Sequence, residues 1–280
     1  MCSSISFNLG FIGGGNMSTA IFKGIIKDRA HPVSKIYVSG PRLTSLAYWK
    51  DEGAHVTDKN SEVYNICEII FLGVKVDMLE QAVSEMADGA LDVTRRRYLV
   101  SMLAGKSIET LKKVCSKYLP DAEISVIRIM PNTPMTVGAG ICLYTPDETV
   151  EMNTTCMVLE RLLKSCALCE RVSEKLLNAL GVLTACGPAY MYLVIEALAD
   201  GAVKQGVPRT LAQRHAAQLM VGSGQMVLQS GKHPGLLKDE VCSPGGSTIC
   251  GVSELENGKI RAAFINAIEA STLKTKDLGK

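Results

Sequence analysis

The chain has 280 residues, of which 47% are hydrophobic, and a formal net charge of +2. That length can bury a full core in one large domain or two ordinary ones. The nearly balanced charge gives no indication of a nucleic-acid partner, and we interpret the Arg95-Arg96-Arg97 triplet as a solvated loop. The ten cysteines are scattered through a chain too long to need disulfide staples, which favours a reducing compartment.

Targeting and metal-binding signals are weak in this sequence. Only about six residues precede the first strand-like run, so we expect no signal or transit peptide. A cytoplasmic location follows as an expectation, with a mitochondrial one left open. Cys166 and Cys169 form a close pair, but the histidines His31, His55, His215 and His233 are far apart in sequence. We therefore expect no metal and interpret these cysteines as buried apolar thiols.

In the first half of the chain, short apolar runs alternate with helical patterns. The strands we predict are Phe7–Gly13, Ile36–Ser39, Ile69–Val74, Tyr98–Leu103, Glu123–Ile129, Gly140–Tyr144 and Cys166–Val172. The helices we predict between them include Ser18–Lys27, Ser107–Tyr118 and Asn153–Lys164. Such alternation is typical of an α/β fold with a mostly parallel, doubly wound sheet. Residues 1–172 are therefore expected to form an α/β domain built on such a sheet.

After about residue 173 strand signals vanish and an all-α domain, residues 173–280, is expected. Its predicted helices are Ala189–Gln205, Arg209–Gln229 and Arg261–Lys276. Leu176 to Ile195 is uncharged and about as long as a membrane-spanning helix. Because Gly187 and Pro188 interrupt it, we interpret it as two helices meeting at a turn inside the protein, with no membrane partner. Helices so apolar, with so little core of their own, predict dimerisation.

The first motif with a chemical meaning is Gly13-Gly14-Gly15-Asn16-Met17-Ser18. It follows the first predicted strand and opens a helix. Glycines there let the backbone turn tightly and approach a pyrophosphate, whose charge the helix N-terminus favours. The position of the motif between strand and helix indicates a dinucleotide site.

The end of the second strand bears on which dinucleotide binds. It reads Val38-Ser39-Gly40-Pro41-Arg42, without the carboxylate that usually holds the ribose hydroxyls of NAD. Ser39 and Arg42 can instead donate to a 2′-phosphate. The sequence therefore favours NADPH, with NADH as the alternative.

Two further segments suggest ligand contacts. In Ser243-Pro244-Gly245-Gly246-Ser247-Thr248, the Pro and Gly residues predict a tight turn and the Ser-Thr pair a helix cap. Converging N–H groups and hydroxyls would hold a carboxylate, although an ordinary capped turn explains the segment equally well. Gly187-Pro188-Ala189-Tyr190 would permit close approach of a ligand or simply of a neighbouring helix.

With these motifs in this order, the chain resembles the pyrroline-5-carboxylate reductases from end to end. The resemblance rests on Phe11 to Met17, Met130-Pro131-Asn132-Thr133-Pro134, Gly187 to Tyr190, and above all the run from Lys238 through Ser243–Thr248 to Ala270. It implies an N-terminal Rossmann domain and a helical dimerisation domain. It also implies homodimers, which family members often assemble into decamers with each active site between domains of two subunits.

The resemblance further implies roles for particular residues. Those expected to hold NADPH are Ile12, Gly13, Gly14, Gly15, Asn16 and Met17 at the pyrophosphate, Ser39 and Asn60 at the adenosine end, Gly73, Val74 and Lys75 along the cofactor, and Leu103, Ala104 and Gly105 near the nicotinamide. Those expected at the substrate are Glu174, Gly245, Gly246, Ser247 and Thr248. The chain departs from the family at Val76, where Pro is usual, and at Glu240, which leaves a polar contact with the cofactor in doubt.

The activity implied is hydride transfer from NAD(P)H to the ring imine of pyrroline-5-carboxylate, giving L-proline. A protonated imine is already electrophilic, so positioning matters more than a strong general acid. Thr248, and then Ser247, are the side chains expected to act, by hydrogen bonding to the substrate carboxylate. The alternatives are a β-hydroxyacid dehydrogenase or other imine reductase, for which Lys204 lacks the usual Asn partner, and a non-catalytic NADPH-binding sensor.

Overall fold

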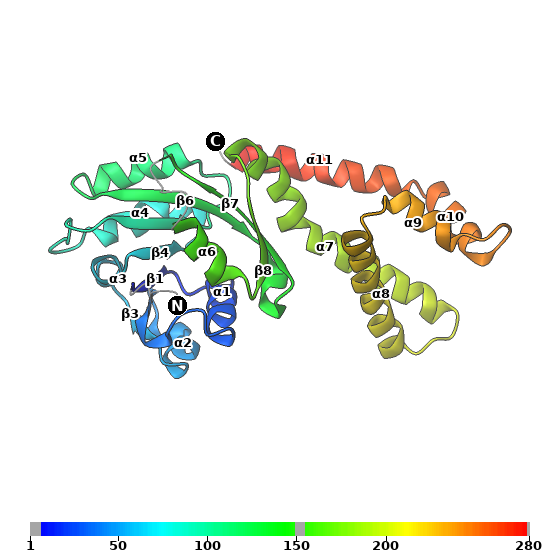
Figure 1. The fold of residues 1–280 in the computed structure, drawn as a ribbon, viewed down its shortest axis with the longest axis horizontal. Coiled ribbons are helices and arrows are strands. Elements are labelled where there is room, and N and C mark those ends of the chain that lie inside the picture. The colour runs from blue at the N-terminus through cyan, green and yellow to red at the C-terminus, as the bar shows by residue number, and fades with distance from the viewer. Residues whose placement is uncertain (1–6, 149–154, 279–280) are drawn as a thin grey trace. The chain divides into compact units, whose positions relative to one another are not determined.

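The computed structural model describes residues 7–148 and 155–278 of the chain (Figure 1). The chain divides into two compact units, one made of Met1–Ala185 with Lys274–Lys280 and the other of Cys186–Leu273. The boundary falls inside helix α7 (Glu174–Lys204), so this helix contributes to both units. Each unit is described by itself below.

The first unit is built on one sheet, in which the described residues form eight strands in the order β3-β2-β1-β4-β5-β6-β7-β8. All neighbouring strands are parallel except β6 and β7, which are antiparallel. The predicted mostly parallel, doubly wound sheet is therefore confirmed. The strands are β1 (Leu9–Ile12), β2 (Ile36–Ser39), β3 (His55–Thr57), β4 (Ile69–Leu72), β5 (Arg97–Ser101), β6 (Ile124–Pro131), β7 (Gly140–Pro146) and β8 (Ala167–Arg171).

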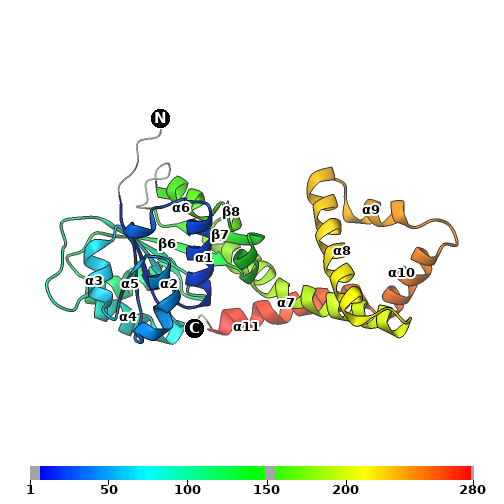
Figure 2. The same cartoon turned by 90° about the horizontal axis from the view of Figure 1, so that it is seen from below.

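Alternating side chains of the strands enter two separate cores, one on each face of the sheet. Phe11 and Phe71 pack with helices α1 (Asn16–Lys27), α2 (Ala47–Asp51) and α6 (Thr155–Leu163). Ile12 and Leu72 pack on the opposite face with α3 (Asn60–Ile66), α4 (Leu79–Met86) and α5 (Ile108–Tyr118). In Figure 2, α1 and α6 lie on one side of the strands and α3 and α4 on the other. Burial on both faces explains why the strands read as continuous apolar runs. The predicted start of α6 at Asn153 lies outside the described residues.

The second unit is helical, as predicted, and its core within the described residues is small. Its helices are the rest of α7 together with α8 (Arg209–Ser230), α9 (Pro234–Val241), α10 (Ser247–Asn257) and most of α11 (Ile260–Leu278). The buried cluster consists of Ala199, Ala212 and Ala216. Large apolar side chains stay exposed in the single chain, including Tyr192, Leu193, Leu219, Met226, Leu228 and Ile265. Exposed apolar area on this scale marks a surface for association.

The interpretation of Leu176 to Ile195 as two helices with a turn is wrong, because α7 continues through Pro188. Proline has no N–H to donate to the carbonyl four residues earlier, which is that of Thr184. Asn132 Nδ2 donates to this carbonyl at 3.0 Å, so the freed acceptor is satisfied and the helix does not end. By length and hydropathy alone, α7 would also be long and apolar enough to cross a membrane.

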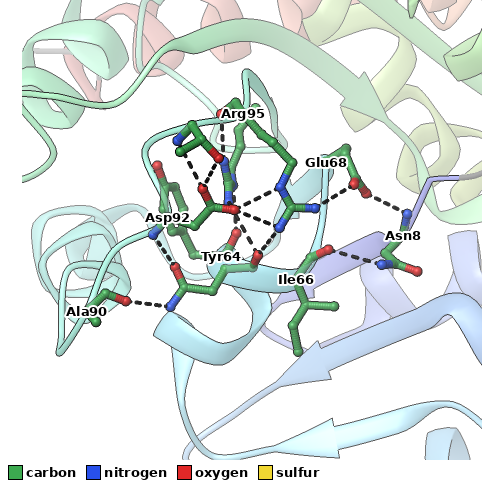
Figure 3. A network of polar contacts seen from close by, with 10 residues as sticks. Asn8, Tyr64, Ile66, Glu68, Ala90, Asp92 and Arg95 are labelled. Carbon is green, nitrogen blue, oxygen red and sulfur yellow. Dashed lines mark hydrogen bonds and ion pairs between the residues drawn. The ribbon is translucent and has the colours of Figure 1, made fainter.

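The interpretation of the arginine triplet as a solvated loop holds for Arg95 and Arg96 but is wrong for Arg97, which begins β5 and is only 2% exposed. Its guanidinium donates to the carbonyls of Tyr64, Asn65 and Arg95 and lies 3.2 Å from Asp92. Arg95 lies between Asp92 and Glu68, which in turn accepts from the backbone N–H of Asn8 (Figure 3). The network therefore joins the amino ends of β1, β4 and β5.

Asp92 makes this network dependent on pH. Hydrogen bonds from Thr94 and then Arg95 hold the pKa of its carboxyl well below the ordinary value. Because the folded pKa is depressed, this stabilisation is present above the pKa of the unfolded chain and is lost as the pH falls below it.

Candidate functional site

The carboxyl ends of β1, β2, β3 and β4 surround a cleft of about 1010 Å³ in the first unit. This is the edge at which open parallel sheets bind ligands, near the point where the strand order reverses. The predicted cofactor residues that line it are Ile12, Gly13, Gly14, Gly15, Asn16, Arg42, Asn60, Gly73, Val74 and Lys75. The structure therefore brings most of the predicted cofactor set together at one site.

The three glycines after β1 differ in what a side chain at each position would contact. Gly13 has a φ of +92°, and a Cβ there would lie 2.6 Å from the carbonyl oxygen of Gly73. A Cβ at Gly14 would lie 2.3 Å from Leu46 Cδ2. Gly15 has an ordinary φ of −71°, and the nearest neighbour of its Cβ would be the Gly73 oxygen at 4.0 Å. The first two glycines are thus required by the fold, whereas the third leaves open space beside the cleft.

Gly15 is the N-cap of α1, and the first turn of this helix carries no acidic residue. The N–H groups of the first turn have no carbonyl partners within the helix, and the helix dipole adds partial positive charge. The space over Gly15 and these donors together fit a pyrophosphate.

At the adenosine end of the cleft the structure corrects the expected role of Ser39. The side chain is fully buried, at 0% exposure, and its hydroxyl donates to Asn60 Oδ1 at 2.6 Å. Asn60 Nδ2 donates to Glu85 Oε2 at 2.8 Å. Since Ser39 is already hydrogen-bonded beneath the cleft and does not line it, it positions Asn60 rather than binding a 2′-phosphate directly.

Several lining residues were not expected from the sequence, notably Gly40, Ser45 and Lys59. Arg42 and Lys59 are exposed cations that come from the loops after β2 and β3. Lys59 was missed because the three residues of β3 were not recognised as a strand. Its parallel pairing with β2, Val38 opposite Val56, brings the loop after β3 to the same edge.

The remaining predicted cofactor residues do not line the cleft. Met17 packs against the core on the α1 face, and Leu103 is buried in the opposite core. Ala104 and Gly105 form a turn before α5, in which Gly105 has a φ of +76°. Their contact with the nicotinamide stays a prediction.

The Ser243–Thr248 segment forms a tight turn in the second unit, as predicted. Gly245 has a φ of +67°, and the Gly246 N–H donates to the Ser243 carbonyl at 3.0 Å. The cap assignment is wrong, however, because Gly246 is the N-cap of α10 and has no side-chain cap hydrogen bond. Ser247 and Thr248 are instead the first helical residues, and both are exposed. Their N–H groups and hydroxyls are therefore available to an anion.

Glu174 connects the start of α7 to two other elements of the first unit. Its Oε1 accepts from Arg128 Nη1 at 2.6 Å and from the Ile108 N–H at 2.8 Å. Arg128 is 2% exposed and also donates to Asn178. These bonds tie the start of α7 to β6 and to the first turn of α5. The expected contact of Glu174 with substrate stays a prediction.

Glu240 lies in the second unit, where it forms an ion pair with Lys232 at 2.6 Å. Both side chains are about half exposed. The carboxylate is therefore occupied by a neighbour on the surface of its own unit.

The glycine cradle, the acid-free helix start and the cleft at the reversal of strand order define a Rossmann-type dinucleotide-binding protein. Residues 8–105 match the family model described as NADP oxidoreductase, coenzyme F420-dependent, and residues 174–278 match that described as pyrroline-5-carboxylate reductase dimerisation.

Comparison with known proteins extends the match to the whole chain. A pyrroline-5-carboxylate reductase 3 of Danio rerio is 42% identical over 97% of this chain and 91% of its own. A pyrroline-5-carboxylate reductase of Synechocystis is 36% identical over 99% of this chain and 100% of its own. The crystal structure of Plasmodium falciparum pyrroline carboxylate reductase with NADP bound has a TM-score of 0.85 at 30% identity, covering 98% of this chain and 99% of that one. The chain belongs to the pyrroline-5-carboxylate reductase family, and the resemblance based on its motifs is confirmed.

Proposed function

We propose that this protein is an NADPH-dependent reductase that converts pyrroline-5-carboxylate to L-proline. The observation that carries the proposal is the relationship over almost the whole chain to proteins that bear this activity in their names. The cleft supports the cofactor part of the proposal, and the turn before α10 supports the substrate part.

The residues of the first unit fit the cofactor at both ends. Gly15 and the N–H groups of the first turn of α1 would hold the pyrophosphate, and Arg42 and Lys59 would hold the 2′-phosphate. When bound, the reduced nicotinamide supplies the hydride. No carboxylate lies at the end of β2 to repel a 2′-phosphate, which supports NADPH over NADH.

The residues of the second unit fit the carboxylate of the substrate. The N–H groups of Ser247 and Thr248, with the Thr248 hydroxyl, would bind it and so orient the ring. A protonated imine needs no further activation, so these donors would accelerate the reaction by positioning. This agrees with the absence of an acidic residue from the first turn of α10, where a carboxylate side chain would compete with the substrate.

The direct test is the oxidation of NADPH by the purified chain, followed by absorbance, with and without pyrroline-5-carboxylate. We expect turnover that depends on the imine and is poor with 2-keto or 2-hydroxy acids. Binding of NADPH without its consumption would overturn the reductase proposal and favour a sensor, whereas faster oxidation with keto acids would favour a dehydrogenase of another substrate class.

Replacing Thr248 by alanine should raise the KM for pyrroline-5-carboxylate by about 10- to 100-fold, because a hydrogen bond to a charged group contributes roughly 1.5–3 kcal/mol. Binding of NADPH should stay nearly unchanged. Thr272→Ala is the matched control, since the Thr272 hydroxyl donates only to the Ile268 carbonyl within α11. Equal losses in substrate and NADPH binding in a folded Thr248→Ala variant would remove Thr248 from the carboxylate site.

Replacing Arg42 by glutamate should weaken NADPH binding by about 10- to 100-fold, since it removes a charged hydrogen bond and adds repulsion of the 2′-phosphate. Binding of NADH should change little, so the preference shifts toward NADH. The dissociation constants of both cofactors, measured by fluorescence titration, give the ratio. Lys113→Glu makes the same charge change on an exposed part of α5 and should leave the ratio as it is. A constant ratio in the Arg42→Glu variant would exclude Arg42 from the site.

We also propose that a second copy of the chain, and not lipid, covers the exposed apolar residues of the helical unit. The match of residues 174–278, which include α7, to the dimerisation model supports this assignment. Assembly of dimers into decamers is a finer proposal. Light scattering on the purified protein measures the mass of the assembly, and co-sedimentation with lipid vesicles tests the membrane alternative.

A further inference from the structure

Two cysteines lie opposite each other at the far edge of the sheet from the cofactor cleft. Cys142 of β7 is the direct Cα partner of Cys169 of β8, and the two strands are parallel. Opposite residues on neighbouring strands are about 4.8 Å apart and project to the same face. Both side chains indeed pack into the core on the face of α1 and α6. Their spacing lies within the range that a disulfide requires, roughly 4.4–6.8 Å between Cα atoms.

The two thiols differ in their access to solvent. Cys142 is fully buried, at 0% exposure, whereas Cys169 is half-buried and lines a surface hollow of about 590 Å³. Arg161 and Lys164 of the α6 segment line the same hollow and are exposed. Glu160, the acidic residue there, accepts a hydrogen bond from the Tyr144 hydroxyl. A small reagent can therefore reach Cys169 from solvent beside two cations, whereas Cys142 is buried and does not line the hollow.

The interaction between the two thiols shifts their pKa values in opposite directions. The Cys142 thiol donates to the Leu143 carbonyl at 3.9 Å, and its proximity to Cys169 lowers the pKa of Cys169 below the ordinary value, against the opposing effects of burial and Glu160. The same interaction, with burial, raises the pKa of Cys142 well above its ordinary value. The accessible cysteine is thus the one with more thiolate, and the thiolate is the reactive form.

We propose that Cys169 and Cys142 form an oxidisable dithiol, in which Cys169 reacts with a hydroperoxide from the hollow and Cys142 then closes a disulfide. No part of the proposed reductase activity uses either residue. The site lies on β7 and β8, whereas the cofactor cleft lies at the ends of β1 to β4.

The chemistry balances in two steps. The Cys169 thiol releases its proton to solvent, and the thiolate attacks the hydroxyl oxygen of the hydroperoxide. An S–O bond forms as the O–O bond breaks, which leaves a sulfenic acid on Cys169, and the departing alkoxide takes a proton from solvent and leaves as an alcohol. The Cys142 sulfur then attacks the Cys169 sulfur, the S–S bond forms as the S–O bond breaks, and water leaves with the proton of Cys142. The two thiols are oxidised and the peroxide is reduced to alcohol and water, or to water alone when it is hydrogen peroxide.

Cys166 is the competing partner for Cys169, since only two residues separate them in the chain. Its thiol donates instead to the Leu163 carbonyl at 3.2 Å, and it is buried at 1% exposure. A Cβ on Gly24 of α1 would lie 2.9 Å from its sulfur, so Cys166 is packed closely against that helix. The register of β7 and β8 places Cys142, and not Cys166, directly opposite Cys169, which favours Cys142 as the partner.

The test is peptide mapping of the reduced, full-length protein after treatment with a stoichiometric amount of hydrogen peroxide. Free thiols are blocked with N-ethylmaleimide before digestion with trypsin. Cys142 falls in the peptide Ile129–Arg161, whereas Cys166 and Cys169 fall in Ser165–Arg171. We expect these two peptides to be joined, with the loss of two hydrogen atoms, and fragmentation to place the link between Cys142 and Cys169.

Three variants with melting temperatures close to that of the parent complete the test. Cys142→Ala should abolish the link and leave a sulfenic acid on Cys169 that dimedone traps. Cys169→Ser should abolish both, and Cys166→Ala should retain the link. A link between Cys166 and Cys169 in the parent would overturn the proposal. So would an unmodified Cys169 under conditions in which the exposed Cys250 is oxidised.

Discussion

Replacing Gly15 by valine is expected to weaken NADPH binding by at least about 100-fold, or about 2.7 kcal/mol, while the protein remains folded. The backbone of Gly15 has an ordinary φ, and its Cβ would enter the space beside the cleft with no contact closer than the Gly73 oxygen at 4.0 Å. A branched side chain in that space would occupy the place proposed for the pyrophosphate. Titration followed by NADPH fluorescence measures the affinity, and the melting temperature without cofactor shows whether the protein remains folded.

Gly14→Ala is the matched control, because it adds a smaller group one residue earlier. Its Cβ would be 2.3 Å from Leu46 Cδ2, so overpacking should lower stability by about 1–3 kcal/mol. Substitution of Gly15 should therefore affect mainly NADPH binding, and substitution of Gly14 mainly stability. Normal NADPH affinity in Gly15→Val would show that the pyrophosphate does not lie over this residue.

Arg97→Met should destabilise the protein by about 2–5 kcal/mol, because it removes a buried donor to three backbone carbonyls and each buried acceptor left without a partner costs about 1–3 kcal/mol. Methionine fills much of the same space but leaves the carbonyls of Tyr64 and Asn65 without this donor. It also removes the stacking of the guanidinium on the Tyr64 ring, where the separation is 4.6 Å. Urea unfolding at fixed protein concentration gives the change in free energy.

Arg96→Met provides the comparison, since it changes the neighbouring residue in the same way. The Arg96 side chain is 32% exposed and its partner Glu123 is 62% exposed, so the change should cost no more than about 1 kcal/mol. Similar losses in the two variants would contradict the view that burial of Arg97 is what makes the network important. Because the network lies at the amino ends of the strands, NADPH affinity of the folded fraction should not change.

Features set by local pattern were predictable from the sequence. The apolar runs of β1 and β4 and the glycines after β1 led to the correct sheet, and to a cleft at the correct edge. These signals are local because a strand buried on both faces and a glycine at positive φ each restrict the residue type on their own.

Features that depend on distant partners were not predictable. From the sequence, Pro188 predicts the end of a helix. In the structure Asn132, far away in the sequence, donates to the Thr184 carbonyl that Pro188 leaves without a donor, so the helix continues. From the sequence, Arg97 appears as a surface charge, whereas in the structure its guanidinium donates to three backbone carbonyls. Ser39 reads as a ligand donor until Asn60 is found to accept its hydroxyl. In each case the deciding group comes from another element, which a pattern along one segment does not contain.

The small core of the helical unit affects how a chain without a partner survives in a cell. Three buried alanines and the partly buried apolar side chains around them cannot offset the conformational entropy lost by ordering five helical segments. On the proposed dimer, the missing stabilisation comes from a second copy, so by mass action the folded fraction rises with the amount of protein made. A newly synthesised chain that meets no partner would remain open to proteases in its C-terminal third. Cellular abundance should therefore fall more steeply than synthesis when expression is reduced.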